Sequence, residues 1–279
     1  MALLELKDLH TFFRTKKGIV KAVNGVSYSV EAGRTLGVVG ESGSGKSVSA
    51  MSILQLLDGN GYIDSGEILF EGRDLTQLSE KEMYSVRGND ISVIFQEPMT
   101  SLNPVFTVSR QVSEPFIIHQ GMTKKQAAAK VIEMLADVKI PNPHIVAKQY
   151  PHQLSGGMRQ RVMIAMALAC KPKLLIADEP TTALDVTIQA QILKLMNDLK
   201  EEHGPSIIFI THDLGVIRQI ADDVAVMYCG QVVEMAPAGT IFMDAEFSHP
   251  YTEGLMNSIP RLSTPTHTRL DAIPGAVPH

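Results

Sequence analysis

Cysteines and long apolar runs are scarce in this sequence. Its two cysteines, Cys170 and Cys229, lie far apart among 279 residues and form neither a disulfide framework nor a C-x-x-C metal pattern, which suits a reducing cytoplasm. The longest apolar runs, such as ISVIF and LLIA, fall far short of the roughly 18 residues that indicate a membrane-spanning helix. These absences argue against a disulfide-rich scaffold and against a helical membrane protein.

An excess of positive charge and a signal-type N-terminus are also missing. The formal net charge is −5 and no basic patch stands out, which argues against a DNA- or RNA-binding protein. The first residues, MALLELKDLH, are charged and lack the apolar segment of a signal peptide. With 44% apolar residues the chain can form a sizeable core. We therefore expect a protein that is soluble, or attached to a membrane only through a partner.

The spacing of apolar residues indicates an α/β protein. Alternation in VSYSV (26–30) favours a half-exposed antiparallel sheet near the N-terminus. Thr123 and Gln126 fit a capping box within a helical stretch at 107–170. Strands and helices alternate after it, which implies a parallel sheet with helices on both faces. The expected strands are 2–9, 21–30, 35–39, 65–72, 91–95, 174–178, 206–211 and 224–228, and further helices are expected at 46–57, 187–203 and 214–221.

The stretch VGESGSGKSV (39–48) contains a phosphate-binding pattern. Its glycines and its G-K-S end fit G-x-x-x-x-G-K-[ST] between an apolar strand and a helix. Glycines let the backbone approach a ligand closely, and successive N–H groups with the helix N-terminus then attract an anion. In such a loop the lysine reaches the β- and γ-phosphates and the serine ligates Mg²⁺. The candidate nucleotide-binding residues are Gly40, Glu41, Ser42, Gly43, Ser44, Gly45, Lys46, Ser47 and Val48.

Two carboxylates follow the apolar strand LLIA. Asp178, at the strand end, could hold Mg²⁺ through water, and Glu179 could accept a proton from an attacking water. Solvated acids at an ordinary strand end are the alternative. The phosphate-binding pattern upstream favours the catalytic interpretation.

The stretch LSGGMRQR (154–161) narrows the class of protein. Ser155, Gly156 and Gly157 are again small residues before a helix. The chain therefore has a second helix N-terminus that could bind a phosphate, besides the one after the loop at 39–48. Here the sequence resembles the nucleotide-binding subunits of ABC transporters, whose signature motif is LSGGQ; Met158 stands where that motif has Gln. The resemblance implies that two subunits sandwich two ATP molecules. Ser155, Gly156 and Gly157 would then contact the nucleotide held by the other subunit's phosphate loop.

Further positions match other motifs of that family. Gln96, in IFQEPMTSLNP, matches the Q-loop, which touches Mg²⁺ or the attacking water and senses the membrane subunit. His212 matches the switch histidine, which reaches the γ-phosphate. Asp185, in ALD, matches the D-loop at the dimer interface, although an aspartate there also suits a helix cap. Phe13, or else Phe12, lies where the family places a ring that stacks on adenine, and either ring could equally belong to the core.

The resemblance covers about residues 2–260 and implies the fold class. We expect an α/β P-loop NTPase with a RecA-like parallel-sheet core, an N-terminal antiparallel β subdomain, and a helical subdomain at about 97–165 that presents the signature. The ATPase domain would span 1–260, and 261–279 would be a C-terminal extension. Many members of the family continue from such an extension into a cysteine-rich tail, and this sequence would be cut before that tail. Because this chain lacks those cysteines, we expect no iron–sulfur cluster.

Several stretches look most like the oligopeptide/dipeptide importer subgroup, which also includes nickel importers. They are QEPMTSLNP, YPHQLSGGM, DEPTTALDVTIQAQI and HPYTEGLMNSIP. The resemblance implies an ATPase that uses ATP and Mg²⁺ to power peptide uptake at the cytoplasmic face of the cell membrane. Its partners would be two transmembrane permease subunits, one of which inserts a helix near Gln96 and MTSLNP. A second, related ATPase subunit would form a heterodimer rather than a homodimer, and a periplasmic or lipid-anchored substrate-binding protein would act indirectly.

Other functions fit the sequence less well. An importer of nickel or another small solute in the same subgroup stays open, because the transported molecule does not touch this subunit. A soluble ABC ATPase of DNA repair would need a long coiled coil, but only 57 residues separate Gln96 from Leu154. A soluble ABC ATPase that acts on ribosomes would have two ATPase domains in one chain, and this chain has one. A GTPase would need the guanine-recognition motif N-K-x-D, which is absent.

Overall fold

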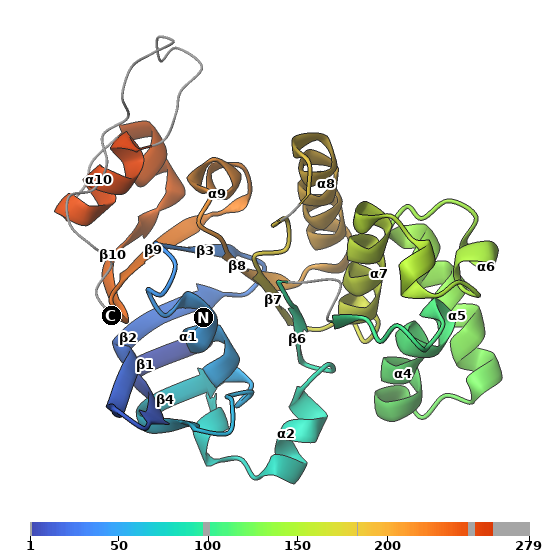
Figure 1. Cartoon of the computed structure of the whole chain (residues 1–279), viewed down its shortest axis with the longest axis horizontal. Coiled ribbons are helices and arrows are strands. Elements are labelled where there is room, and N and C mark those ends of the chain that lie inside the picture. The colour runs from blue at the N-terminus through green and yellow to red at the C-terminus, as the bar shows by residue number, and fades with distance from the viewer. Residues whose placement is uncertain (1, 97–100, 183, 245–248, 259–279) are drawn as a thin grey trace. The chain divides into compact units, whose positions relative to one another are not determined.

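The computed structural model describes residues 2–96, 101–182, 184–244 and 249–258 (Figure 1). The chain divides into two compact units. The first combines residues 1–78 with residues 208–279, and the second spans residues 79–207.

An antiparallel sheet forms the N-terminal part of the first unit. Its strands are β1 (Ala2–Thr15), β2 (Gly18–Glu31), β4 (Gly61–Phe70) and β5 (Arg73–Asp74), followed by a 3₁₀ turn at Leu75–Gln77. They lie in the order β2-β1-β4-β5, and β1 pairs antiparallel with both neighbours. In β2 the side chains of Val26, Tyr28 and Val30 are buried and the serines between them are exposed. The predicted half-exposed antiparallel sheet is therefore confirmed.

The rest of the described first unit combines strands of a second sheet with helices. The elements are β3 (Thr35–Val39), α1 (Lys46–Ile53), β8 (Ser206–Ile210, which begins in the second unit), α9 (Leu214–Ile220), β9 (Asp223–Tyr228), β10 (Gln231–Pro237), a π-helical turn at Thr240–Asp244 and α10 (Pro250–Asn257). β3 lies between β9 and β8, runs parallel to β9, and is buried along its whole length, while β10 adds an antiparallel edge. Gly37 in β3 admits helix α9, because a Cβ there would lie 2.7 Å from Ile217 Cγ2.

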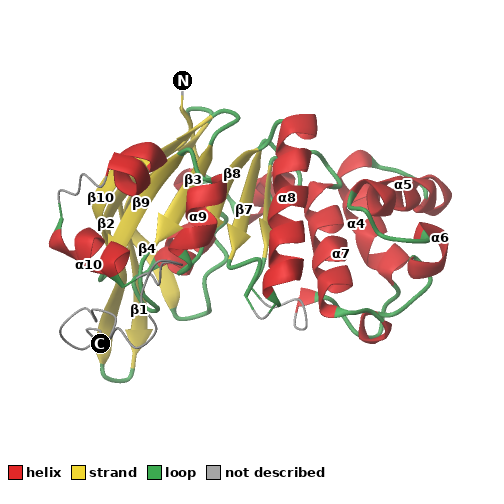
Figure 2. Ribbon diagram, turned by 90° about the horizontal axis from the view of Figure 1, so that it is seen from above, coloured by secondary structure: helices red, strands yellow, loops and turns green. Residues whose placement is uncertain are grey.

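The second unit combines a parallel strand pair with a group of helices (Figure 2). Its elements are α2 (Glu80–Val86), β6 (Ile91–Ile94), α4 (Val108–Gln120), α5 (Lys124–Asp137), α6 (Pro143–Val146), a 3₁₀ turn at Pro151–Gln153, α7 (Gly156–Leu168), β7 (Leu174–Asp178) and α8 (Val186–His203). β6 pairs parallel with β7. Phe116 of α4, Ala127 of α5 and Ala169 after α7 form one buried cluster. That cluster joins the helices around a common core.

Local signals set several helix ends where the sequence predicts them. Thr123 accepts a hydrogen bond from the N–H of Gln126, whose side chain accepts one from the N–H of Thr123, so the predicted capping box starts α5. Gly204 takes the left-handed conformation, with φ 72°, and ends α8 as predicted.

Other boundaries differ from the predictions. Helix α1 ends at Ile53 rather than Leu57, because Gln55 has φ 51° and cannot continue the helix. Strand β1 continues to Thr15, well past residue 9; Asp8, with φ 46°, introduces a register shift that breaks the alternation of the sequence. The sequence does not predict helices α2 and α10 and strand β10, because they are short and lack the continuous apolar run that marks the predicted short strands.

We predict that Leu135→Ala destabilises the second unit by about 2–5 kcal/mol, because the side chain is fully buried and its loss leaves a cavity. Urea unfolding followed by circular dichroism measures the change. Lys130→Ala in the same helix is the control; it removes a surface ion pair with Glu133 and should cost less than about 1 kcal/mol. Equal losses in the two variants would contradict a core role for the buried Leu135 side chain.

Candidate nucleotide-binding site

The phosphate-binding loop connects β3 to α1 and runs very close to neighbouring backbone. A Cβ at Gly40 would lie 2.2 Å from the carbonyl oxygen of Met227, and one at Gly45 would lie 2.4 Å from that of Ala22. Both glycines have positive φ, 150° and 97°. Any side chain at either position would clash with main-chain atoms that cannot move aside, so glycine is required there.

Lys46 points into the curve of this loop. Its ammonium group donates to the carbonyl oxygens of Gly40 and Glu41, both at 2.8 Å, and lies 3.4 Å from Ser44 Oγ. The residue is only 6% exposed. Ser42 and Gly43 at the tip of the loop are exposed, and Ser47 and Val48 follow in the first turn of α1, half-buried. A buried cation, a bare loop and a helix N-terminus therefore converge at one point that is open to solvent, which suits a phosphate group.

Two contacts from the C-terminal part of the chain hold the loop, and neither was anticipated from the sequence. The N–H of Gly230, in the β9–β10 turn, donates to the carbonyl oxygen of Ser44 at 3.0 Å. The N–H of Glu41 donates to the hydroxyl of Tyr251 in α10 at 3.0 Å. The stretch HPY (249–251) carries a local signal for a helix start, since proline favours the first helical position. Nothing in it indicates a contact with the loop.

His212 lies at the same edge of the sheet as the loop. It follows β8, which neighbours β3, and the N–H of Thr211 donates to the carbonyl oxygen of Val38 at 3.3 Å. The next residue, Asp213, caps α9 by accepting from the N–H of Gly215 at 2.8 Å. The ends of these two adjacent strands thus bring His212 and the phosphate-binding loop to one region of the first unit.

The two aromatic candidates for adenine stacking differ in exposure. Phe12 is 8% exposed, lies edge-on to Tyr62 at 6.3 Å and is covered by Lys21. Phe13 faces the other side of β1, is half-buried, and packs over Gly61, where a Cβ would lie 2.7 Å from its ring. Because Phe12 is committed to the core, Phe13 is the better candidate for stacking.

In the second unit the structure brings Gln96 and Glu179 together. Gln96 Nε2 donates to Glu179 Oε2 at 3.0 Å, and Thr182 Oγ1 donates to the same oxygen at 2.9 Å. Glu179 has φ 45°, an unusual conformation for a glutamate, directly after β7. Sequence reasoning missed Thr182, although its spacing of three residues from Glu179 in DEPTT is the usual one for a side chain reaching back across a turn. Asp178, the last residue of β7, is 6% exposed.

The signature residues form a helix start. Ser155 Oγ accepts from the N–H of Met158 at 3.3 Å and caps α7. Gly157 lets α8 approach, because a Cβ there would lie 2.9 Å from Ile188 Cγ2; Gly156 has more room. Asp185 Oδ1 accepts from the N–H of Ile188 at 2.9 Å, so the capping role considered for this residue is present.

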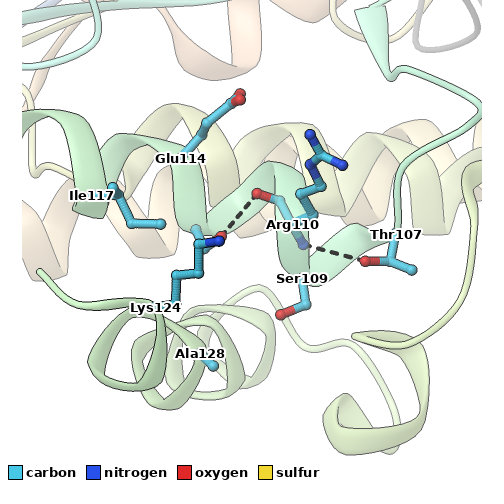
Figure 3. A pocket seen from close by; sticks show the side chains of 8 residues that line it. Thr107, Ser109, Arg110, Glu114, Ile117, Lys124 and Ala128 are labelled. Atoms are coloured by element: carbon cyan, nitrogen blue, oxygen red, sulfur yellow. Dashed lines mark hydrogen bonds between the residues drawn. The ribbon is translucent and has the colours of Figure 1, made fainter.

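An open pocket of about 530 Å³ lies between α4 and α5 (Figure 3). Arg110 and Lys124 give it positive charge and Glu114 negative charge. The Arg110 guanidinium lies over the Phe106 ring at 3.5 Å. The other lining residues are Thr107, Ser109, Ser113, Ile117 and Ala128. Since no residue predicted for nucleotide binding lines this pocket, it is separate from the candidate site.

Each unit, taken by itself, carries side chains whose chemistry suits a magnesium nucleotide. The Ser47 hydroxyl in the first unit is a hard oxygen donor of the kind that Mg²⁺ prefers, and so are the Asp178 carboxylate and the Gln96 amide oxygen in the second. The bare backbone at Gly40 and Gly45 fits close approach by phosphate oxygens. Among the described residues, we find no helix with the length and apolar character needed to cross a bilayer.

Comparisons with known proteins give close matches. The family model described as "ABC transporter" matches residues 23–182, and that described as "Oligopeptide/dipeptide transporter, C-terminal region" matches residues 233–279. The oligopeptide transport ATP-binding protein OppD of Bacillus subtilis is 56% identical over 99% of this chain and 77% of OppD. The dipeptide transport ATP-binding protein DppD of the same organism is 54% identical over 93% of this chain and 77% of DppD.

A solved structure supports the same assignment at the level of the fold. The ATP-binding cassette MJ0796, described as a dimeric post-hydrolysis state bound to ADP and Pi, superposes with a TM-score of 0.75 and 29% identity, over 84% of this chain and 98% of that one. The predicted α/β P-loop fold with its antiparallel and parallel sheets is therefore confirmed. By these matches in sequence and in structure, the chain belongs to the ATP-binding proteins of the ABC transporter family.

Proposed function

We propose that this chain is the ATP-binding and hydrolysing subunit of an ABC importer that takes up di- and oligopeptides. The main support for ATP hydrolysis is the environment of Glu179, whose carboxylate accepts hydrogen bonds from Gln96 and Thr182. The peptide class is supported by the names of relatives that are 50–56% identical and by the match of the C-terminal region.

The phosphate-binding loop would hold the nucleotide. Residues 40–48 would surround the phosphates, the Lys46 ammonium would contact the β- and γ-phosphates, and Phe13 would stack on adenine. Ser47, Asp178 and Gln96 would hold Mg²⁺, which supplies charge neutralisation at the phosphates when bound.

Glu179 would act as general base in hydrolysis. It would accept a proton from the attacking water while the water oxygen bonds to the γ-phosphorus and the bond to the β–γ bridging oxygen breaks, giving ADP and phosphate. The two hydrogen bonds to Oε2 fix the orientation of this carboxylate. His212 would contact the γ-phosphate.

The working form would be a sandwich of two ATPase subunits. Ser155, Gly156, Gly157 and Asp185 would contact the nucleotide bound to the other subunit, and the helix N-terminus at Ser155 suits an anion. Closure is a population shift driven by ATP, because only the closed state adds these contacts. We favour a heterodimer with a related subunit.

The remaining partners follow from the importer assignment. Helices α4 to α7 would form the helical subdomain, at about 97–165 within an ATPase domain of 1–260. Two permease subunits would hold the chain at the cytoplasmic face of the membrane and receive substrate from a binding protein. The permease helix would dock near Gln96 and MTSLNP, of which Met99 and Thr100 lie outside the described residues, as does the extension at 261–279.

Reconstitution tests the transported substrate. The chain is combined with its permease subunits, related ATPase and binding protein in vesicles, and uptake of labelled di- and oligopeptides is compared with uptake of nickel. ATP-dependent peptide uptake is the expected result. Uptake of nickel alone would replace the peptide assignment with a metal importer of the same subgroup.

We predict that Lys46→Ala weakens ATP binding and raises the dissociation constant about 10- to 100-fold. A hydrogen bond to a charged group contributes about 1.5–3 kcal/mol, which corresponds to a change of this size. Titration with a fluorescent ATP analogue measures the affinity. Lys16→Ala, at an exposed lysine of the same unit, is the control for loss of one positive charge. Unchanged affinity in Lys46→Ala would show that the loop has another function.

We predict that Glu179→Gln separates binding from hydrolysis. Glutamine keeps the size of glutamate but cannot accept the water's proton, so turnover should fall about 10²- to 10⁴-fold. ATP binding should persist or tighten, and an ATP-bound dimer should accumulate on size-exclusion chromatography. Phosphate release is measured on the assembled complex, since an intact partner site could hide the loss. Glu201→Gln, at an exposed glutamate of α8, should keep normal turnover; near-normal turnover in Glu179→Gln would refute the base assignment.

We predict that Ser155→Arg leaves ATP binding to the isolated chain nearly intact but blocks turnover in the assembled complex, because the arginine would occupy the position of the other subunit's nucleotide. Ser155→Ala separates this block from the loss of the helix cap, which costs about 1 kcal/mol of stability. Normal ATPase activity of Ser155→Arg in the complex would count against the sandwich.

A further inference from the structure

Helix α10 contacts the start of the phosphate-binding loop through one side chain. The hydroxyl oxygen of Tyr251 accepts a hydrogen bond from the N–H of Glu41 at 3.0 Å, across 210 positions of sequence. Tyr251 is 6% exposed, so water competes little for this contact. The tyrosine also lines a small pocket with the exposed loop residues Ser42 and Gly43. The contact therefore lies at the edge of the loop that would receive the nucleotide.

The chain around Tyr251 fixes the position of its ring. His249 Nδ1 accepts a hydrogen bond from the Tyr251 N–H at 3.1 Å and caps α10, and Pro250 occupies the first helical position, where its fixed φ is already helical. The Tyr251 ring packs on Tyr228, with centroids 4.5 Å apart. Burial raises the pKa of Tyr251, against a smaller lowering by the Glu41 hydrogen bond, so the hydroxyl stays neutral at physiological pH.

The same peptide segment also contacts the lysine of the loop. The carbonyl oxygen of Glu41 accepts from Lys46 Nζ at 2.8 Å, while its N–H is held by Tyr251. Both polar groups of the Glu41 backbone are thus used, one toward α10 and one toward the ammonium. A shift of this residue would change the position of Lys46.

We propose that Tyr251 is a positioning residue for nucleotide binding. It holds the Glu41 backbone, and through it the Lys46 ammonium, in the arrangement that phosphate requires, so the C-terminal region contributes to the affinity of the loop for ATP. The inference rests on the proposed function, in which this loop binds ATP. The physical basis is preorganisation, because a loop that is already ordered loses less conformational entropy on binding.

Tyr251→Phe in the full chain tests this role, since it removes the hydroxyl and keeps the ring. We expect about 2- to 10-fold weaker binding of MgATP, the effect of losing one neutral hydrogen bond. In nucleotide-free protein we expect faster amide hydrogen exchange in a peptide covering residues 40–46 and unchanged exchange in α4 and α5. Tyr228→Phe is the matched control, because it removes the hydroxyl of the other ring in the pair; it should bind MgATP within about 2-fold of the unmodified chain.

The outcomes separate this inference from the proposed function. Wild-type affinity together with unchanged exchange at 40–46 in Tyr251→Phe would overturn the positioning role. Equal losses in both phenylalanine variants would assign the effect to the loss of either hydroxyl near the loop rather than to the hydrogen bond with Glu41, and would also overturn it. If Lys46→Ala keeps full ATP affinity, the proposed function fails, and the exchange measurement alone then decides whether Tyr251 orders the loop.

Discussion

The close approach of the phosphate-binding loop to neighbouring main chain is the constraint on which the first unit depends. Carbonyl oxygens of Met227 and Ala22 lie where side chains of Gly40 and Gly45 would begin. Two strands distant in sequence therefore shape the loop, and glycine is the only residue type that fits between them. Because of this tight packing, the backbone curves so that a buried lysine and a helix N-terminus lie near one point.

The loop is also stabilised from the C-terminal part of the chain. Gly230 in the β9–β10 turn and Tyr251 in α10 each hold a loop peptide group by a hydrogen bond. A phosphate-binding loop in isolation would be flexible, because it is rich in glycine and serine. The two hydrogen bonds restrict that freedom, and the one from Tyr251 links a region matched by the oligopeptide/dipeptide transporter model to the candidate nucleotide site.

In the second unit the candidate base is held by a comparable arrangement. Glu179 adopts a left-handed backbone conformation, which costs on the order of 1–3 kcal/mol for a residue other than glycine. Its carboxylate accepts hydrogen bonds from Gln96, which follows β6, and from Thr182 in the turn after β7. β6 and β7 are parallel neighbours, so their carboxyl ends bring Gln96 and Glu179 together. A carboxylate held in one orientation suits the proposed role of general base, since proton transfer depends on geometry before pKa.

The sequence by itself determined the features that depend on residues close along the chain. The phosphate-binding pattern, the capping box at Thr123 and the helix end at Gly204 all follow from local spacing, and the family resemblance added the order of the remaining motifs. The elements β10 and α10 are not predicted, because they are short and lack the continuous apolar run by which the short buried strands are predicted.

Only the tertiary structure decided which distant groups meet. Gln96 and Glu179 are 83 positions apart, and Glu41 and Tyr251 are 210 apart, so no local pattern encodes either contact. That Phe12 is buried and Phe13 half-buried likewise depends on the face of β1 that each ring occupies, which the register shift at Asp8 obscures in the sequence. The physical reason is common to all three: such contacts depend on the path of the chain through the sheets, and that path is set by packing of the whole unit.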